Sequence, residues 1–497
     1  MQAPPPSAAL PRDELAIWMV VLVAIVLRVL TYAPHQIGYA DEFMQYLEQG
    51  KRLATGHGIV PWEYRYGARG ALIPQLLAVP SWLGAHLAPG SNLGLGLVRL
   101  VFAGFGALLL WAGWRIGGLV SPRHALAVMA ALAVWWEAVL FSHLMLSESI
   151  GAALILAGAA LVLDGRSAAR ALMLGGMLIG LGVIARLQYG LFAAVLVLGA
   201  LPWRGGHADW LRWRWVVLGG LVALMAGAIS DLAMGWTPYR WVLVNLSMNM
   251  GGSAARAARF GTEPATYYLK LMLAHGGLLA PVILGAAVWA GVRIVVLRPV
   301  LAAAVVNLVA HSLITHKEYR FVWISVAALV MLAAAGAAQV ALQRWPGLSP
   351  RRLAVGALGG WWLLSASGQA MSGGYASMRG GAAITGLAVR AADTPDICGI
   401  AVANQWRAHV VPSILRHDVP LLVAPAGVVD DGETLPAAVQ AGANALVLPR
   451  RPIGSEAYDA IGCLPMPQGR ACLFIRPGGC KPAPAYSYQA ALAREDL

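Results

Sequence analysis

Apolar segments long enough to cross a lipid bilayer recur along the chain from about residue 15 to residue 370. A bilayer interior offers no water to backbone N–H and C=O groups, so a segment of this length crosses it as a helix. With 59% hydrophobic and only 12% charged residues, the chain of 497 residues also has too little charge to cover a soluble fold. We therefore predict an all-α polytopic membrane protein with about eleven transmembrane helices, at 15–31, 93–117, 124–141, 149–163, 171–185, 188–201, 215–230, 274–292, 299–315, 321–342 and 353–369.

The net charge of +13 follows an alternating pattern along the chain. Arginines mark every second gap between the predicted spans, for example at 115–123, 166–170 and 344–352. Because cytoplasmic loops are enriched in Lys and Arg, this alternation predicts a cytoplasmic N-terminus and places the other gaps on the outer face. The same bias, together with sites for anionic lipid, accounts for the positive charge without a nucleic-acid partner.

Two parts of the chain are predicted to lie outside the membrane. A long first outer loop, 32–92, contains two amphipathic stretches, 41–54 and 70–88, that suit the membrane interface. After the membrane domain (1–370), residues 371–497 read as a small periplasmic α/β domain. Its predicted strands are "CGIAVA", "PLLVA", "NALVLP" and "ACLFI", with a helix at 434–441. All four cysteines lie in this segment, which suits an oxidising compartment and one or two disulfides, although free thiols are as plausible for any given pair.

The stretch "THKEYRF", residues 315–321, interrupts the apolar pattern between two predicted spans. His316, Lys317, Glu318 and Arg320 bring four ionisable groups into five positions. Arginine and histidine can donate hydrogen bonds to a phosphate, and lysine adds a point charge. The alternative is a polar turn that only directs membrane insertion.

Further polar groups fall in the predicted outer gaps. Asp41 and Glu42 could supply a general base or simply begin an interfacial helix, where acidic groups favour the positive end of the dipole. Arg186 could bind a phosphate or extend to the lipid headgroups. The segment from His143 to Glu148 is more simply an ordinary polar loop. One carboxylate and several cations facing one compartment indicate transfer from an anionic lipid donor.

Several motifs resemble those of glycosyltransferase family 22, the lipid-phosphate-mannose-dependent α-mannosyltransferases. "HKEYRF" matches the HKE-x-RF signature, and "DEFMQYLE", "WEYRYGARG", "FSHLMLSES", "ARLQ", "DLAMGWTPYRWVLVN" and "GTEPATYYL" resemble further family patterns in the same order. The resemblance covers residues 15 to about 345 and implies a GT-C fold in a bacterial-type member. Before Asp41 the family usually has His-Pro, where this chain has Tyr-Ala, which leaves the acceptor and the sugar open.

The resemblance also implies roles for individual residues. Asp41 and Glu42 would be catalytic, and substrate or donor phosphate would be bound by Gln45, Glu63, Arg69, Arg186, Asp231, Tyr267, His316, Lys317, Glu318 and Arg320. The reaction would move mannose with inversion from a polyprenyl-phosphate donor to a glycan or lipid-linked acceptor at the periplasmic face of the inner (plasma) membrane. Neither a metal nor another cofactor would be needed, and the expected partners are these two substrates and membrane lipid. The alternatives are a GT-C transferase of another lipid-linked sugar, such as arabinose or glucose, and a non-enzymatic transporter of lipid-linked sugars.

Overall fold

The computed structural model describes residues 14–33, 38–203, 205–250, 261–374, 381–403, 408–409, 411–415, 418–466 and 469–494. The chain divides into two compact units. The first contains Met1–Tyr32, Phe102–His143 and Ser147–Gly374, and the second contains Ala33–Val101, Leu144–Leu146 and Tyr375–Leu497. The boundary between the units falls within one helix, α5 (Leu93–Gly118).

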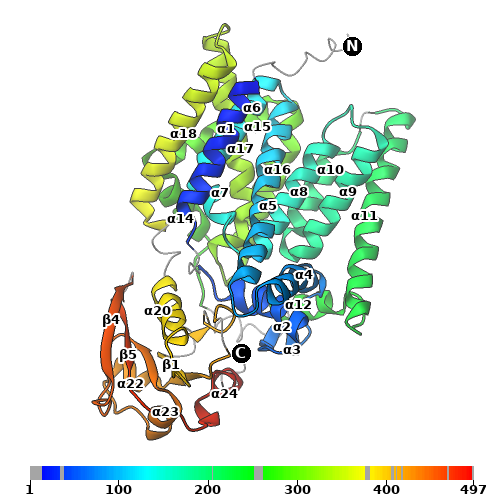
Figure 1. The fold of residues 1–497 in the computed structure, drawn as a ribbon. Helices are drawn as coiled ribbons and strands as arrows, with labels where there is room; N and C mark the ends of the chain where they lie inside the picture. The colour runs from blue at the N-terminus through cyan, green and yellow to red at the C-terminus, as the bar shows by residue number, and fades with distance from the viewer. Residues whose placement is uncertain are drawn as a thin grey trace. The chain divides into compact units, whose positions relative to one another are not determined.

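The first unit is helical (Figure 1). Its helices are α1 (Glu14–Thr31), the second half of α5, α6 (Pro122–Val134), α7 (Trp136–Phe141), α8 (Ser147–Val162), α9 (Ala169–Ala185), α10 (Gly190–Ala200), α11 (His207–Ala233), α12 (Arg240–Met250), α14 (Tyr267–Gly276), α15 (Ala280–Arg293), α16 (Arg298–Leu313), α17 (Trp323–Arg344) and α18 (Pro350–Ser372). Short 3₁₀ turns connect several of them, including η2 (Leu187–Tyr189) and η5 (Tyr319–Val322). Every predicted span contains a helix.

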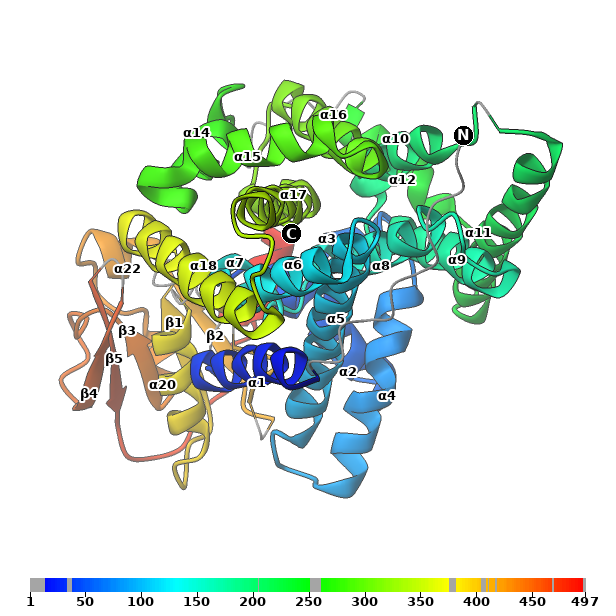
Figure 2. The ribbon, with the colours of Figure 1, turned by 90° about the horizontal axis from the view of Figure 1, so that it is seen from above.

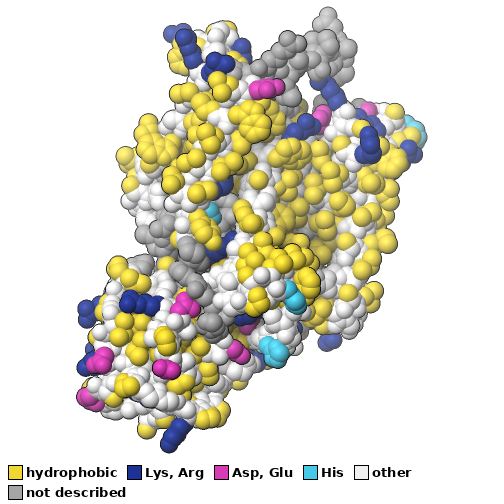
Figure 3. All heavy atoms as spheres, viewed as in Figure 1, with side chains coloured by type: hydrophobic (Ala, Val, Ile, Leu, Met, Phe, Trp, Pro, Cys, Tyr) yellow, Lys and Arg dark blue, Asp and Glu magenta, His cyan; other side chains and the backbone are white. Residues whose placement is uncertain are grey.

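Membrane-spanning character follows from the length and composition of these helices. Within the described chain, six helical stretches are long and apolar enough to cross a membrane: Glu14–Thr31, Leu93–Gly118, His207–Ala233, Tyr267–Arg293, Val295–Leu313 and Tyr319–Arg344. Figure 3 shows hydrophobic side chains over the outward face of the helices, with Lys and Arg gathered at one end, the top in this view. The prediction of a mostly helical, multi-span membrane protein is confirmed.

Helix α17 forms the centre of the first unit. Seen from above, it lies between α6 on one side and α15 and α16 on the other (Figure 2). Most of its apolar residues are buried. Its sequence is rich in alanine and contains one glycine, Gly336, and such small residues allow neighbouring backbones to approach closely. The same device joins α9 to α11, because a Cβ at Gly176 would lie only 2.0 Å from the carbonyl oxygen of Val216.

The predicted span 124–141 is not one continuous helix. It consists of α6 and α7, which meet at Trp135 in extended conformation (φ −65°, ψ 119°). The break leaves the Trp136 N–H without a partner inside the helix, and the Ser365 hydroxyl of α18 accepts it at 2.7 Å. The hydroxyl of Ser365 thus replaces the hydrogen bond that the helix break removes from the backbone.

The second unit begins with Ala33–Val101, and the amphipathic stretches predicted in this segment are helical. The stretch predicted at 41–54 forms a π-helical segment, η1 (Glu42–Leu47), that continues into α2 (Glu48–Thr55), and the stretch at 70–88 forms α4 (Leu72–Leu87). The short helix α3 (Trp62–Arg65) lies between them in sequence. π-helical turns are rare and occur often at functional sites.

The C-terminal part of the second unit is a small mixed β-sheet domain with helices. Its elements are α20 (Ala382–Ala392), β1 (Ile400–Ala403), β2 (Leu421–Ala424), α22 (Ala426–Asp430), α23 (Ala437–Gly442), β3 (Ala445–Leu448), β4 (Asp459–Pro465), β5 (Arg470–Ile475), η6 (Pro484–Tyr486) and α24 (Tyr488–Arg494). The strand order is β2-β1-β3-β5-β4, with β1 parallel to β2 and β3, and β5 antiparallel to β3 and β4. Four strands are those predicted, and the predicted helix at 434–441 corresponds to the shorter α23.

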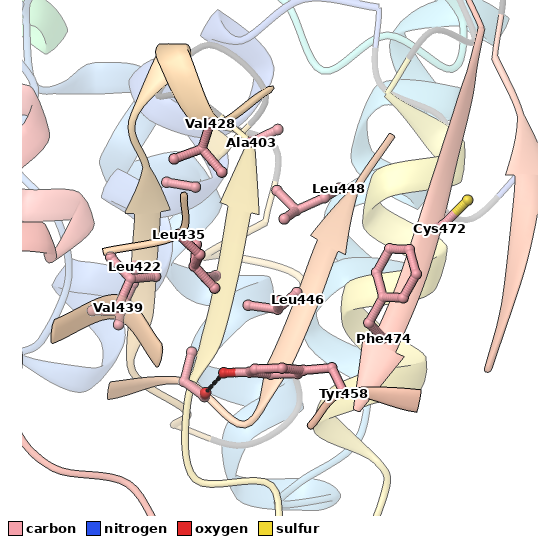
Figure 4. Packing of buried hydrophobic residues seen from close by; sticks show 13 residues of the cluster. Ala403, Leu422, Val428, Leu435, Val439, Leu446, Leu448, Tyr458, Cys472 and Phe474 are labelled. Atoms are coloured by element: carbon pink, nitrogen blue, oxygen red, sulfur yellow. Dashed lines mark hydrogen bonds between the residues drawn. The ribbon is translucent and has the colours of Figure 1, made fainter. Parts of the chain in front are cut away.

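The core and two disulfides stabilise this domain. Apolar side chains of all central strands pack together, and the Tyr458 hydroxyl donates to the Ala443 carbonyl at 2.6 Å (Figure 4). The disulfides join Cys398 to Cys480 and Cys463 to Cys472, so none of the four cysteines is free. The cysteines that sequence reasoning left open between disulfides and thiols are therefore all oxidised.

Candidate active site

The polar stretch between α16 and α17 is organised around the carboxylate of Glu318. Arg320 donates to it side-on, from Nε to Oε2 at 2.8 Å and from Nη2 to Oε1 at 3.0 Å. His316 Nε2 lies 3.3 Å from the same Oε1. Burial opposes ionisation of Glu318, but Arg320 and His316 outweigh it and lower its pKa to about 2. The hydrogen bond that His316 donates to Glu318 raises the pKa of His316. The stretch is a structured ionic cluster and not a simple polar turn.

Arg186 lies in the first unit beside another carboxylate, the fully buried Glu148. It follows α9 in extended conformation (φ −140°, ψ 93°) and is only 2% exposed, so it does not extend to the lipid headgroups. Its Nη2 lies 3.1 Å from Oε1 of Glu148 at the start of α8, and Nε of Arg320 lies 3.6 Å from the same oxygen. Gly151 of α8 permits this approach, because a Cβ there would lie 3.0 Å from Cβ of Arg186.

Glu148 corrects the interpretation of residues 143–148 as an ordinary polar loop. Its side chain is fully buried and bridges two arginines. Both guanidinium groups also lie over one ring, that of Phe321, at 5.0 Å for Arg186 and 5.5 Å for Arg320. Two cations held within reach of one carboxylate and one aromatic face form a compact, water-poor electrostatic site.

Two further predicted residues lie beside this cluster. Lys317 is buried, and its Nζ donates to the backbone carbonyl of Glu263 at 2.7 Å, which ties the segment before α14 to the cluster. Tyr267 begins α14 within electrostatic range of Glu263 and Glu318. The adjacent Tyr268, which sequence reasoning missed, is buried, bonds to the backbone of Glu318 and lies within electrostatic range of Arg186.

Asp231 has a local role at the end of α11. Its Oδ2 accepts the Tyr239 N–H at 2.9 Å, and Tyr239 adopts φ of +58°, a conformation that costs energy for a non-glycine residue. The backbone carbonyl of Asp231 also accepts the N–H of Trp236 at 3.0 Å. Its described contacts therefore hold the turn that follows α11.

In the second unit, Asp41 and Glu42 lie in different surroundings. Glu42 is buried, and its carboxylate accepts three backbone N–H groups, from Gly38 at 2.8 Å, Tyr39 at 3.0 Å and Met145 at 2.9 Å. Burial raises the pKa of Glu42, while these hydrogen bonds and Arg99 oppose the rise. Glu42 therefore clamps the loop, whereas Asp41, at the N-cap of η1, is partly exposed.

Three other groups surround Asp41. Glu63 is buried and accepts from Gln45 Nε2 at 2.5 Å, and burial together with the negative charge of Asp41 raises its pKa to about 7. Arg69 lies within electrostatic range of both carboxyl groups and opposes that rise. His409, from the C-terminal domain, also lies within electrostatic range of Asp41. Sequence reasoning identified Gln45, Glu63 and Arg69 only by resemblance and missed His409.

Most of the predicted residues, together with Glu148, thus form two clusters, one in each unit. The first, which we call the cation cluster, contains Glu148, Arg186, His316, Glu318 and Arg320, and can hold an anion such as a phosphate. The second, which we call the carboxyl cluster, contains Asp41, Gln45, Glu63 and Arg69, and can accept a proton. Among the described residues, no group of His, Cys, Asp and Glu side chains is arranged to hold a metal ion.

Known proteins are similar to this chain in sequence and in fold. Residues 18–378 match the model of the Alg9-like mannosyltransferase family. GPI mannosyltransferase 3 of Yarrowia lipolytica is 28% identical over 326 residues, a stretch that covers 61% of this chain and 59% of that protein. Two crystal structures of ArnT from Cupriavidus metallidurans share the fold: the form bound to undecaprenyl phosphate has a TM-score of 0.58 and 13% identity, over 95% of this chain and all of that one. The apo form has a TM-score of 0.56 and 14% identity, over 92% of this chain and 97% of that one.

The family model covers most of the chain, including both clusters, and the solved structures show the fold. The chain therefore belongs to the Alg9-like mannosyltransferase family and is a multi-pass membrane protein with a GT-C fold like that of ArnT.

Proposed function

We propose that the protein is an inverting mannosyltransferase that uses polyprenyl-phosphate mannose as donor and a hydroxyl of a glycan or lipid-linked acceptor. The observation that carries the proposal is the buried Arg186. Its Nε has no hydrogen-bond partner among the described residues, although the side chain is almost completely buried. A buried donor of this kind costs free energy unless an acceptor fills the site, and a phosphate supplies acceptors of matching charge.

In this reaction, the acceptor hydroxyl attacks the anomeric carbon of mannose on the face opposite the phosphate. A C–O bond to the acceptor forms, the C–O bond to the phosphate breaks, and the polyprenyl phosphate leaves with the bonding electron pair. Asp41 takes the proton of the attacking hydroxyl, because both oxygens of Glu42 already accept hydrogen bonds from backbone N–H groups. Phosphate is a good leaving group, so no second carboxylic acid is required.

The cation cluster stabilises the charge that develops on the departing phosphate. Arg186, Arg320 and His316 are fixed beforehand by Glu148 and Glu318, so they need little reorganisation during the reaction. The mannosyltransferase name of the Yarrowia relative supports the sugar, and the undecaprenyl phosphate bound to ArnT supports the class of lipid carrier. Charge alternation along the sequence supports a periplasmic site on the inner membrane.

The experiment is to incubate the purified protein with synthetic prenyl-phosphate mannose and a panel of glycan and lipid-linked acceptors. We expect a mannosylated product with inverted anomeric configuration, measured by mass spectrometry and NMR. Prenyl-phosphate arabinose and glucose serve as competing donors, and their preferential use would replace mannose in the proposal. Movement of labelled donor across proteoliposomes without any transfer would instead support a transporter.

A matched pair of arginine variants makes the experiment specific. Arg186→Gln removes a charge from the cation cluster. Arg298→Gln instead removes the arginine that begins α16, whose Nε donates to the Val292 carbonyl of α15. Only the first should weaken use of the donor. Equal donor use by both variants and by the unmodified protein would contradict the proposed phosphate site.

A further inference from the structure

The first unit holds a large cavity that the proposed reaction does not use. Its volume is about 630 Å³, within the range of roughly 300–1,000 Å³ that is usual for ligand pockets. The walls come mainly from α15, α17 and α18, and Ala127 of α6 and the connection 345–349 contribute as well. None of the described residues that line the cavity belongs to the cation cluster, so the cavity is a separate site.

The cavity exists because small side chains face one another across it. The residues of α17 that line it are all alanines, namely Ala333, Ala334, Ala337, Ala338 and Ala341. On α18, Gly356 and Gly360 line it one turn apart, and a Cβ at either position would meet no atom within 4 Å. Ala337 and both glycines are exposed, so the cavity is open on one side of the helices.

The rim of this opening is apolar. Val282, Leu279 and Trp345 line the cavity and remain 64%, 47% and 58% exposed. An exposed apolar surface of this kind marks contact with a membrane or with another hydrophobic partner. In a chain whose helices span the bilayer, the opening therefore faces lipid chains.

Positive charge lies at one end of the cavity. Arg352 is the charged residue among the described residues that line it, and its exposed side chain is in the first turn of α18. Arg344 and Arg351 flank the same connection, and the guanidinium of Arg344 lies 6.0 Å from the ring centre of Trp345. The connection is at the end of the helices where Lys and Arg side chains gather (Figures 1 and 3).

The elements around the cavity offer this charge no acidic partner. Neither Asp nor Glu occurs in α6, α15, α17, α18 or the connection 345–349. At a different connection of the first unit, by contrast, Arg115 forms an ion pair with Asp164 at 3.2 Å. An occupant that matches this site must therefore combine a long apolar chain with an anionic group at one end.

We infer that the cavity binds an anionic phospholipid, with an acyl chain between α17 and α18 and the phosphate at Arg352. Basic pockets between membrane helices bind anionic headgroups, which are abundant in the cytoplasmic leaflet. The charge alternation of the sequence predicts that this end of the helices faces the cytoplasm. The site is thus a lipid site in its own right, and it does not depend on the proposed transfer.

The chain of the prenyl-phosphate donor fits the site less well. Arg320 of the cation cluster lies in η5, directly before α17, whereas Arg352 follows that helix. The 22 residues of α17 span about 33 Å, so one prenyl phosphate cannot place its only phosphate at both ends. A prenyl chain carries no charge at its far end and would leave Arg352 without an anion.

Photocrosslinking in nanodiscs tests the inference on the unmodified protein. The probe is phosphatidylglycerol with a diazirine in its acyl chain, present as a small fraction in phosphatidylcholine, and the control is phosphatidylcholine with the same diazirine chain. We expect phosphatidylglycerol to label the lining segments of α17 and α18 about fivefold more, as for one arginine near an anionic headgroup. Equal labelling of these segments by the two lipids would overturn the inference.

A pair of arginine variants tests the headgroup contact. Arg352→Gln should lower labelling by phosphatidylglycerol to the level of phosphatidylcholine. Arg170→Gln is the matched control, because Arg170 is an exposed arginine at the start of α9 and does not line the cavity. Unchanged labelling in Arg352→Gln, or the same loss in both variants, would contradict a phosphate at Arg352.

A pair of glycine variants tests the chain contact. Gly356→Leu/Gly360→Leu fills the cavity and should abolish its labelling. Gly359→Leu is the control, since a Cβ there also meets no atom within 4 Å but Gly359 does not line the cavity. Labelling of the double variant at the level of Gly359→Leu would overturn the inference.

Thermal unfolding in detergent provides a readout that needs neither crosslinking nor turnover. Phosphatidylglycerol should raise the melting temperature more than phosphatidylcholine does, because a ligand that binds only the folded state stabilises it, and Arg352→Gln should remove the difference. Equal effects of both lipids on the unmodified protein would contradict the inference. So would displacement of the crosslinking probe by prenyl phosphate that Arg186→Gln prevents, since that result would assign the cavity to the donor chain.

Discussion

Replacing Glu148 by glutamine should destabilise the protein and make it respond more strongly to prenyl phosphate. Oε1 of Glu148 lies 3.1 Å from Arg186 and 3.6 Å from Arg320, and the carboxylate is fully buried. At an effective dielectric constant of about 20, the first contact alone corresponds to about 5 kcal/mol of Coulomb attraction. Removing one partner from a buried pair costs about 3–5 kcal/mol, because the other charge remains buried without compensation.

A bound prenyl phosphate would supply the missing negative charge. If Glu148→Gln binds prenyl phosphate tenfold more tightly than the unmodified protein, saturating ligand adds about 1.4 kcal/mol more stabilisation in the variant. The assay is thermal unfolding in detergent, followed by tryptophan fluorescence, with and without prenyl phosphate. We expect a melting temperature several degrees lower in Glu148→Gln, and a larger rise on adding the ligand.

Two further variants test whether Glu148 is coupled to Arg186 and to bound prenyl phosphate. Glu137→Gln is the matched control, since Glu137 is another buried carboxylate of the first unit, bound to His275 at 2.8 Å and to Trp135 at 2.8 Å. It should also destabilise, but leave the response to prenyl phosphate unchanged. The double variant Glu148→Gln/Arg186→Gln should lose less stability than the sum of the single variants. Additive losses, or an unaltered ligand response in Glu148→Gln, would refute the coupling.

Three other predictions concern the donor site, the carboxyl cluster and the topology. Arg320→Ala and His316→Ala should each weaken donor use about ten- to a hundredfold in a folded protein, and donor kinetics like those of the unmodified protein would contradict this. Because the folded pKa of Glu63 is about 7 and the unfolded value is 4.5, the folded state binds more protons between these values, so stability falls as pH rises from 4.5 to 7. Glu63→Gln should remove a decrease on the order of 3 kcal/mol across this window, and melting curves with the same pH slope in both proteins would count against it. We expect the C-terminus to lie outside the cytoplasm, so a fused reporter that works only outside the cytoplasm should be active there. Activity of a fused reporter that works only in the cytoplasm would contradict the predicted topology.

Much of the fold could be predicted because hydrophobic length is a strong signal in membrane proteins. Each apolar segment contains a helix, and four of the five strands coincide with apolar runs. Strand β4 was missed because its side chains are mostly exposed and its sequence "DAIGCLP" has no apolar run. The break at Trp135 was missed as well, because the hydrogen bond that compensates it joins Trp136 to Ser365, which is 229 positions away in the sequence.

The candidate site was predictable where one stretch concentrates polar groups, as in 315–321. Glu148 was underestimated because a lone carboxylate at the mouth of a span looks like a loop residue. Its importance comes from Arg186 and Arg320, which only the tertiary fold brings to it. His409 carried no sequence signal, since it lies in a domain without recognisable motifs and beside carboxylates that are distant in sequence.

Single-turnover mannosyl transfer, measured together with donor binding, tests the proposed role of Asp41 as the general base most directly. Asp41→Asn keeps the size and polarity of the side chain but removes its basicity. We predict a rate about a hundred- to ten-thousandfold lower, with donor binding unchanged. Transfer by the Asn variant at the rate of the unmodified protein would contradict the claim, and a matching loss in Glu42→Gln alone would assign the base to Glu42.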